Sequence, residues 1–374
     1  MILLAAGQLG IVEARRDDAS DFIEDLLKAE PSAPENAGRQ RVLAGRALAD
    51  IGLRSVTDPT RRWVLDALQQ TMQDLDPDTK QPNDPPRTVV RLRYEAGEAL
   101  DELGWLPPDL NTWVYCPGCA DDGGDLMAMK YPVTNAQFER FILAGGYEQP
   151  AYWGGENGEG WQYRQRPNWS QPRLWNDVRV GAERRGYPVV GVSWYEAAAY
   201  AAWLAELLEQ ALRQAQDTAR RGKMDLPPED QALVADLLNL DALTVQLPAE
   251  AEWERLAGGT AADDRYPWDP PTGPATGEQA AVLARANTKE AELGGTSPVA
   301  MYPLGSSQPF GLLDLAENVW EWTATFDDPF YVLRGGAWYW EIDHARVGSR
   351  YGGRPLSRNL IRGFRLVSPV GSGS

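Results

Sequence analysis

Thiols and imidazoles often carry catalysis or bind transition metals, and this sequence contains very few of them. Its two cysteines, Cys116 and Cys119, form a CPGC motif, and His344 is its single histidine. Three such groups cannot complete a four-ligand zinc site unaided. A CPGC pair can act as a redox couple, but this one lies in a turn rich in Pro, Gly and Asp. We interpret it as a plain turn, with redox chemistry as the alternative.

Other catalytic signatures are also missing from the sequence. His344 can act as a lone acid or base, but no partner for it is evident, so we expect it at the surface. The sequence has no phosphate-binding Gly-rich loop, no serine nucleophile elbow and no His-Glu-x-x-His zinc motif. These motifs therefore provide no candidate catalytic site.

One segment, residues 332–367, differs chemically from the rest of the chain. The chain carries a net charge of −18, but this segment has only two acidic residues against its arginines. Its arginines are Arg334, Arg346, Arg350, Arg354, Arg358, Arg362 and Arg365. It shows no 3.6-residue apolar period, so we expect loops between short strands. Its mixture of Tyr, Trp, Ser, Gly and Asn is typical of an adaptable binding surface.

The same arginines can have a purely structural role. An arginine presents five donors, which can hold loops to carbonyl groups and carboxylates. Both roles can coexist in one segment, with the arginines as scaffold and the intervening residues as surface.

Length and composition exclude several classes of protein. With 374 residues and 43% hydrophobic content, the chain can form two domains or one large one. A pI near 4.6 argues against nonspecific nucleic-acid binding, so we expect no nucleic-acid partner. No apolar run is long enough to span a membrane, and the start MILLAAGQLGIVEARR resembles no secretion signal. We therefore expect a cytoplasmic protein without a membrane partner.

Residues 1–107 have the pattern of an α-helical repeat region. RQRVLAGRALADIG at 39–52 echoes RLRYEAGEALDELG at 91–104, and a third helical pattern lies at 59–76 between them. We predict HEAT-like helix pairs here. The segment MILLAAGQLG is also apolar, which suggests an upstream helical or signalling domain of a longer protein as a partner. Residues 108–124 are expected to be a linker.

Residues 125–370 form the second predicted domain, in which helices come first and strands follow. Capping boxes at Thr134–Gln137 and Ser193–Glu196 each begin a helix, and LPAEAEWERLAGG contains a third. Residues 206–244 are expected to be a helical insertion, with DQALVADLLNL as its inner helix. From Tyr266 onward, short strands and turns replace helices. The predicted fold class is α+β.

The ordered blocks of this domain resemble a known family. The blocks are YPVTNAQFERF, PVVGVSWYEAAAYAAWL, LPAEAEWE, YPW, PFGLLDLAENVWEW, RGG-x-W and a final GFR. This series resembles the formylglycine-generating-enzyme (sulfatase-modifying factor) domain, a variant of the C-type lectin fold. Residues 332–367 most resemble the variable region of diversity-generating retroelement variable proteins. The resemblance implies that adenine-directed mutagenesis rewrites the positions between the fixed Arg, Gly and Trp residues to form a ligand-binding surface.

The catalytic residues of the related enzymes are absent from their places. Formylglycine-generating enzymes use two cysteines just after RGG-x-W, where this chain has the segment 339–344, YWEIDH. The related sulfoxide synthases need three histidines, and this chain has one. We therefore predict a non-enzymatic ligand-binding protein that requires no cofactor. A divergent formylglycine-generating or sulfoxide-synthase type of oxidoreductase is the alternative.

The variable-region pattern divides the segment into surface and scaffold. The expected ligand-binding residues are Ala337, Tyr339, Trp340, Glu341, Asp343, His344, Val347, Ser349, Tyr351, Gly353, Leu356, Ser357, Asn359, Leu360 and Arg362. The expected inward-facing residues are Gly335, Gly336, Trp338, Arg346, Arg350, Pro355, Arg358, Gly363, Phe364 and Arg365. Exposed aromatics and Arg362 favour an acidic or aromatic-bearing ligand, and we expect that ligand to be a protein.

Relatives in this family commonly hold structural calcium through oxygen ligands. The resemblance implies one such site at Asn318 and Glu321 in ENVWEW, and a second at Asn287 with Glu290 or Glu292. The alternative is that Asn318 caps a turn and Glu321 pairs with an arginine.

Overall fold

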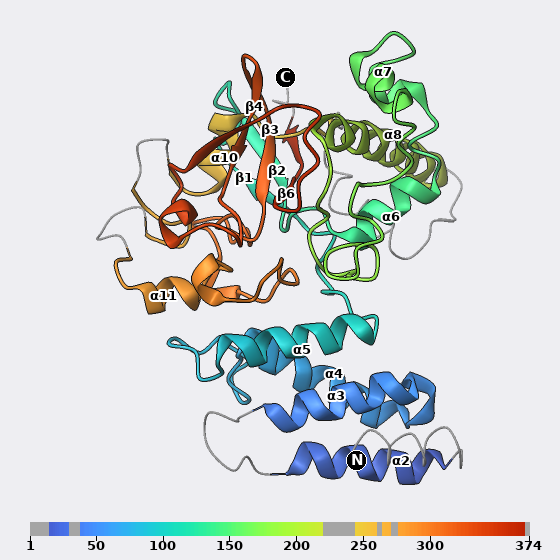
Figure 1. Ribbon diagram of the computed structural model, residues 1–374, viewed down its shortest axis with the longest axis vertical. Helices are drawn as coiled ribbons and strands as arrows, with labels where there is room; N and C mark the ends of the chain where they lie inside the picture. Colours follow the sequence, from blue (N-terminus) through green and yellow to red (C-terminus); the bar gives the residue numbers. More distant parts are fainter. Residues whose placement is uncertain (1–14, 30–37, 220–243, 260–263, 271–275, 371–374) are drawn as a thin grey trace.

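The computed structural model describes residues 15–29, 38–219, 244–259, 264–270 and 276–370. Its N-terminal helices are stacked beneath a larger domain of mixed helices and strands (Figure 1). The short 3₁₀ helices are η3 (Leu53–Ser55), η4 (Pro150–Trp153), η5 (Lys289–Ala291), η6 (Pro303–Gly305) and η7 (Ile342–Ala345). None of the described helices has the length and apolar character needed to cross a membrane.

The N-terminal helices follow the predicted pattern. They are α2 (Arg16–Lys28), α3 (Arg39–Ile51), α4 (Asp58–Gln73) and α5 (Val90–Glu102). Thr57 caps α4, because its side-chain oxygen accepts from the Thr60 N–H, and Asp74 ends it in the left-handed conformation. The three helical patterns predicted within residues 39–104 are therefore confirmed. The apolar segment MILLAAGQLG lies outside the described residues.

Helix α5 joins the helical layer to the domain above it. One hydrophobic cluster contains residues of α2 to α5 together with Tyr187, Met301 and Tyr302 of the domain. Gly97 allows close approach, since a Cβ there would lie 2.6 Å from the Pro298 ring. Next to it, the Asp101 carboxylate accepts the Gly186 N–H at 2.8 Å. The helices therefore pack firmly against the domain.

The first sheet is antiparallel and has the order β1-β2-β7. Its strands are β1 (Trp113–Cys116), β2 (Asp125–Met129) and β7 (Val367–Val370). Strand β1 lies inside residues 108–124, which we expected to be a linker, so that expectation is wrong. The CPGC turn lies in the connection from β1 to β2. The pairing of β2 with β7 brings distant parts of the chain together.

The helices of the domain begin where the capping boxes place them. Helix α6 (Asn135–Leu143) starts at Thr134, whose N–H donates to Gln137 at 2.9 Å. Helix α8 (Trp194–Ala219) starts with the Ser193–Glu196 box. The remaining helices are α7 (Glu159–Gln165), α10 (Glu250–Leu256) and α11 (Gln279–Leu283). The predicted insertion begins as a continuation of α8, and DQALVADLLNL lies outside the described residues.

The second sheet has the order β5-β4-β3-β6, and three of its strands include parts of the arginine-rich segment. Its strands are β3 (Trp320–Asp327), β4 (Phe330–Arg334), β5 (Arg350–Gly353) and β6 (Arg362–Gly363). Side chains alternate between the two faces of a strand. Trp320 and Trp322 therefore share one face, while Glu321 points to the other face, together with its register partner Arg334.

Candidate functional site: an aromatic surface on an arginine scaffold

The segment 332–367 leaves β4 through two glycines that no larger residue can replace without strain. Gly335 and Gly336 have φ values of 96° and 81°. A Cβ at Gly336 would lie 2.5 Å from a Glu317 carboxylate oxygen, and one at Gly335 would lie 3.1 Å from the Trp253 ring. The chain therefore enters the binding segment in tight contact with the core.

Two fully buried arginines hold this segment from beneath. Arg365 donates from Nε and Nη2 to both oxygens of Glu321, at 2.7 and 2.8 Å, and also to the Leu313 carbonyl. Arg334 pairs with Glu250 at 3.0 Å and with Glu254, and it donates to the Ser349 carbonyl at 2.9 Å. Each guanidinium is matched by carboxylates, which is what burial of a charge requires.

Three more arginines reach carboxylates at the edges of the segment. Arg346 pairs with Asp264 at 3.1 Å, and Arg350 donates to Glu250 at 2.7 Å. Arg358 donates to the buried Glu196 at 2.8 Å and stacks over Trp169 at 4.3 Å.

The scaffold prediction holds for most of its residues. Gly335, Gly336, Gly363, Phe364 and Arg365 are buried, and Arg358 is hydrogen-bonded inward to Glu196. Trp338 and Pro355 are of intermediate exposure, and Arg346 bonds to Asp264 at the surface. Arg350 is exposed but is held by Glu250 and Asp327. Five of the seven arginines thus have the structural role that the sequence left open.

Most of the predicted surface residues have exposed or half-exposed side chains. The exposed ones are Tyr339, Glu341, Asp343, Tyr351, Leu356, Asn359 and Leu360. Those of intermediate exposure are Trp340, His344, Ser349 and Ser357. Tyr339 is the most exposed aromatic of the segment, at 63%. These residues provide an apolar and polar surface that no neighbouring element covers in the described structure.

Four predicted surface residues are buried, and the expectation for their side chains is wrong. Ala337 and Val347 belong to hydrophobic core clusters, with exposures of 0% and 1%. Gly353 packs against Trp322, where a Cβ would lie 2.5 Å from the ring. Arg362 is only 6% exposed because its side chain runs between two aromatic rings. None of the four was distinguishable in sequence from its exposed neighbours.

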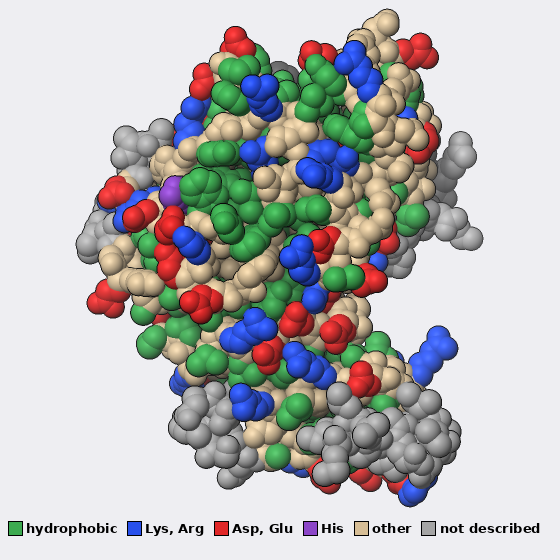
Figure 2. Space-filling view, viewed as in Figure 1, with side chains coloured by type: hydrophobic (Ala, Val, Ile, Leu, Met, Phe, Trp, Pro, Cys, Tyr) green, Lys and Arg blue, Asp and Glu red, His purple; other side chains and the backbone are tan. Residues whose placement is uncertain are grey.

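Aromatic rings on one face of the second sheet form a connected group, which we call the aromatic face. It consists of Trp320, Trp322, Trp340, Tyr351 and the enclosed Arg362. The Tyr351 ring lies 5.6 Å from Trp320 and 5.8 Å from Trp340, and the Arg362 guanidinium lies 5.3 Å from Trp322 and 5.7 Å from Tyr351. Hydrophobic side chains gather beside the only histidine of the chain on the face shown in Figure 2. Sequence reasoning placed Trp340, Tyr351 and Arg362 here but missed Trp320 and Trp322.

The loop that carries Tyr339 and Trp340 is fixed by contacts to η5. The Lys289 N–H donates to the Trp340 carbonyl at 3.0 Å, and its ammonium group pairs with Glu341 at 2.6 Å. Glu290 accepts the Ile342 N–H at 3.1 Å. The hydrogen bond from Lys289 lowers the pKa of the Glu341 carboxyl, so that side chain stays ionised at neutral pH. The loop beside the aromatic face is therefore held by a charge-balanced ion pair and by two hydrogen bonds.

Neither cysteine reaches this surface. Cys116 and Cys119 are free and buried in the cluster around Trp253 and Leu312. Burial raises the pKa of Cys116 to about 12 and that of Cys119 to about 11, so both are thiols at neutral pH. The His344 ring lies 4.6 Å from the Trp340 ring at a tilt of 52°, and its Nδ1 has no hydrogen-bond partner among the described residues.

The two implied calcium sites differ, because the Asn318 and Glu321 side chains are already occupied by protein partners. Both Glu321 oxygens accept from Arg365, and one also accepts from Trp253 at 2.7 Å. The Asn318 amide bonds at both ends, accepting from the Ser297 N–H and donating to the Ser297 carbonyl. At the second implied site, Asn287 Oδ1 and Glu290 Oε2 are both buried without a hydrogen-bond partner in the described structure, so calcium there stays a prediction. Glu321 pairing with an arginine is therefore the alternative that the structure supports.

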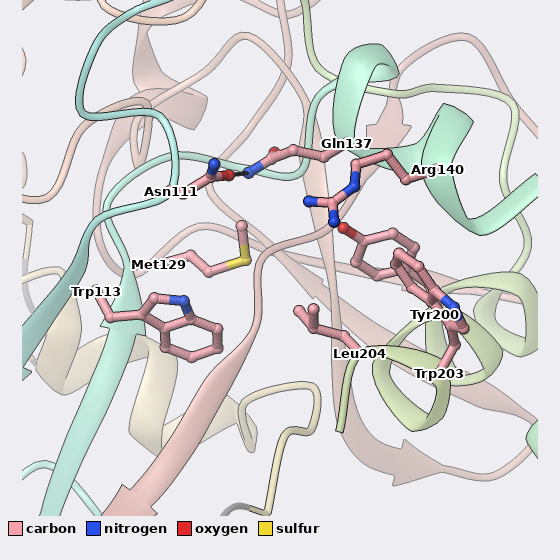
Figure 3. Close-up of a pocket in the computed structure, with 8 residues that line it drawn as sticks. All are labelled: Asn111, Trp113, Met129, Gln137, Arg140, Tyr200, Trp203 and Leu204. Atoms are coloured by element: carbon pink, nitrogen blue, oxygen red, sulfur yellow. Dashed lines mark hydrogen bonds between the residues drawn. The ribbon is translucent and has the colours of Figure 1, made fainter. Parts of the chain in front are cut away.

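Other features had little or no signal in the sequence. Phe326 and Phe330, at the tip of the β3–β4 hairpin, are exposed by 56% and 38%. A separate small pocket lies between β1, β2, α6 and α8, where Gln137 donates to Asn111 and Arg140 extends towards Tyr200 (Figure 3). The free volume of this pocket is on the order of that needed by one water molecule.

The α+β fold with its arginine-held C-terminal segment is that of a formylglycine-generating-enzyme-like domain of the C-type lectin type. The chain belongs to the family of the sulfatase-modifying factor enzyme 1-like domain, whose model matches residues 124–370. The α+β fold class and the helical N-terminal region agree with the expectation from sequence.

The relatives of this chain have different names and activities. It is 28% identical over 273 residues to the hercynine oxygenase of Mycobacterium tuberculosis, covering 64% of this chain and 51% of that protein. It is 32% identical over 222 residues to the inactive C-alpha-formylglycine-generating enzyme 2 of Bos taurus, covering 56% of this chain and 59% of that protein. The chain spans about half the length of the hercynine oxygenases it matches.

Solved structures include a similar variable protein. Treponema denticola variable protein 1 is 21% identical, with a TM-score of 0.38, covering 66% of this chain and 85% of that chain.

Proposed function

We propose that this chain is a non-enzymatic ligand-binding protein that presents a hypervariable surface between residues 332 and 367. The observation that supports it is the division of labour within that segment. Five arginines are tied to carboxylates of the fold, while Tyr339 and Tyr351 remain exposed between them. Large rigid aromatics on a fixed frame are enriched at binding hot spots.

The oxidoreductase alternative receives less support from the described residues. Some relatives are named hercynine oxygenases, so a divergent oxidoreductase of the formylglycine-generating or sulfoxide-synthase type is the competing function. The site segment has Tyr339 and Trp340 where formylglycine-generating enzymes have reactive thiols. The two cysteines of the chain lie in another cluster, and the raised pKa of each disfavours the thiolate.

Binding by the exposed tyrosines can be tested with selected peptides. A random peptide library is panned against the immobilised chain, and the recovered binders are measured on the Tyr339→Ser/Tyr351→Ser double variant. We expect at least tenfold weaker binding. Tyr115→Ser is the matched control, because Tyr115 is 53% exposed on β1 and outside the segment. Equal binding to the double variant would refute the proposed surface.

The formylglycine-generating form of the competing activity has a direct assay. The chain is incubated with copper, oxygen and a sulfatase-type cysteine peptide, and the peptide mass is followed. We expect the mass to stay unchanged. Multiple turnovers with loss of the thiol would establish the oxidoreductase function instead.

Hypervariability makes a separate genetic prediction. A near-copy of the coding sequence for residues 332–367, differing only at adenines, should lie beside a reverse-transcriptase gene. Sequencing of the surrounding genome tests this. A locus with neither feature would leave a binding surface that is not diversified.

A further inference from the structure

Arg362 differs from the other buried arginines of the segment. Arg334 and Arg365 each have carboxylate partners, but no ion pair to Arg362 occurs in the described part of the chain. Its Nε and Nη1 groups are buried and have no hydrogen-bond partner there. Burial lowers the pKa of this guanidinium, with Tyr351 opposing that effect. Tyr351 hydrogen-bonds this guanidinium, but no carboxylate of the described residues balances its charge. A buried cation without such a partner is costly, so its retention needs a reason.

Two further donors on the same face also lack acceptors. The indole Nε1 atoms of Trp320 and Trp340 are buried without a hydrogen-bond partner among the described residues. Trp320 is the direct β-ladder partner of Arg362, so their side chains project from the same side of the sheet. The Trp320 and Trp340 rings lie 6.2 Å apart, and both rings contact Tyr351. An indole N–H and a guanidinium can only donate, so the group contains donors alone.

We propose that Arg362, with the indole N–H groups of Trp320 and Trp340, forms a subsite for one carboxylate of the bound ligand. This deepens the proposed binding function and rests on it. An ionised carboxylate is acceptor-only, with about four lone-pair sites, and therefore complements this set of donors. A guanidinium–carboxylate pair is also the strongest and most directional hydrogen-bonded match available to Arg362.

The shape of the subsite favours a carboxylate over a tetrahedral oxyanion. The Arg362 guanidinium lies over the Trp322 ring and also over the Tyr351 ring, so flat surfaces flank it. A planar two-oxygen group can approach the guanidinium edge between such rings, whereas phosphate or sulfate is bulkier. The ligand class is thus a polypeptide that offers an Asp or Glu side chain, or a C-terminal carboxylate, beside apolar groups.

The Tyr351 ring lies close to Arg362, Trp320 and Trp340, so we assign access to the subsite to movement of this side chain. Tyr351 covers Arg362 and is itself 38% exposed, at the edge strand β5. Rotation of an exposed side chain takes picoseconds to nanoseconds, so binding requires no change in the fold. Gly352 and Gly353 follow Tyr351 in β5, and they add no side chain above the ring.

The subsite can be tested on the full chain with small molecules. The chain is labelled with ¹⁵N, and the indole N–H signal of Trp340 is assigned from the Trp340→Phe variant and the Arg362 Nε–H signal from Arg362→Lys. Benzoate is titrated at constant ionic strength, with uncharged benzamide and inorganic phosphate as parallel probes. We expect benzoate to shift both signals saturably and benzamide to leave them unchanged. Equal shifts with benzamide, or tighter binding of phosphate, would overturn the carboxylate subsite.

Variants supply the second readout. Arg362→Met should weaken benzoate binding at least tenfold, read at the Trp340 signal, without a loss of thermal stability, because it removes a lone buried charge. Arg354→Met is the matched control from the same segment and should bind benzoate like the wild type. Arg362→Lys keeps the charge without the planar fork and should bind at least fivefold more weakly than the wild type. Undiminished binding by Arg362→Met or Arg362→Lys would refute the assignment.

Failure of the subsite is distinguishable from failure of the proposed function. If panned peptides bind through Tyr339 and Tyr351 but benzoate shifts neither signal, the subsite is wrong and the binding surface stands. If benzoate binds as expected but no peptide depends on the two tyrosines, the subsite stands and the polypeptide ligand is refuted.

Discussion

Asp101 gives a quantitative test of how the helical layer is attached to the domain. This α5 residue is 6% exposed, and its carboxylate accepts the Gly186 N–H of the domain at 2.8 Å. Burial raises the pKa of its carboxyl from an ordinary 3.8 to about 6, although the Gly186 hydrogen bond and Arg184 oppose the rise. A difference of one pKa unit corresponds to about 1.4 kcal/mol, so ionised Asp101 costs the folded state about 3 kcal/mol.

The sign of the pH dependence of stability follows from the raised pKa of Asp101 in the folded chain. Below pH 3.8 the carboxyl is protonated in the folded and unfolded chains, and no stability is lost. Between pH 4 and pH 6 the unfolded chain ionises first, so the free energy of unfolding falls as pH rises, and the loss is complete above pH 6. Asp101→Asn removes the ionisation but keeps an oxygen that can accept from Gly186.

We therefore expect Asp101→Asn to stabilise the protein at pH 7.5 by up to about 3 kcal/mol, and hardly at all at pH 4. Urea unfolding followed by tryptophan fluorescence at both values measures this. The exposed neighbour Glu102 provides the control, because Glu102→Gln should change stability by less than about 0.5 kcal/mol at either pH. Destabilisation by Asp101→Asn at pH 7.5 would mean that Arg184 and Gly186 outweigh burial and that the reasoning is wrong.

Three further predictions concern the core and the surface. Cys116, with a pKa of about 12, and Cys119, with a pKa of about 11, are under ~0.1% thiolate at pH 8 in the folded chain. Iodoacetamide should therefore label the folded chain at least ~100-fold more slowly than the unfolded chain. Fast labelling in the native state would contradict the burial. Arg365→Met strands the Glu321 charge and should cost about 3–5 kcal/mol in urea unfolding, whereas Arg179→Met at an exposed pair should cost under about 1 kcal/mol. In thermal melts, Trp340→Ser should cost about 3 kcal/mol or more of stability, because Trp340 packs on the core. Tyr339→Ser should cost about 0.5 kcal/mol or less, because Tyr339 is 63% exposed. Equal costs for the two variants would contradict this difference.

Local signals were sufficient to predict much of the fold. The Thr134–Gln137 and Ser193–Glu196 boxes specify helix starts through contacts within four residues, and both helices begin there. Strand β1 was missed because it is only four residues long and the connection to its partner β2 is rich in Pro, Gly and Asp, which is also the composition of a linker. The third strand of that sheet, β7, pairs with β2 from the far end of the described chain, and short-range patterns contain no information about such a distant partner.

The candidate site shows the same limit at the level of single side chains. The pattern of the segment separated scaffold from surface well at Gly336, Arg365 and Tyr339. It failed at Arg362 and Ala337, because their burial depends on Trp322 and on the core beneath, not on neighbours in sequence. The pattern also gave no indication that Trp320 and Trp340 would present unpaired donors.

The placement of the arginine partners has a consequence for protein engineering. Arg358, Arg334 and Arg365 find their carboxylates at Glu196, Glu250 and Glu321, which are spread across three different elements of the domain. A designer can therefore vary the loops of residues 332–367 in place, since the anchors that fix them are not part of what varies. The same segment cannot be transplanted as a cassette, because a new host would have to supply every one of those acids at the correct depth. Libraries built on this protein should keep the whole domain and randomise only between its arginines.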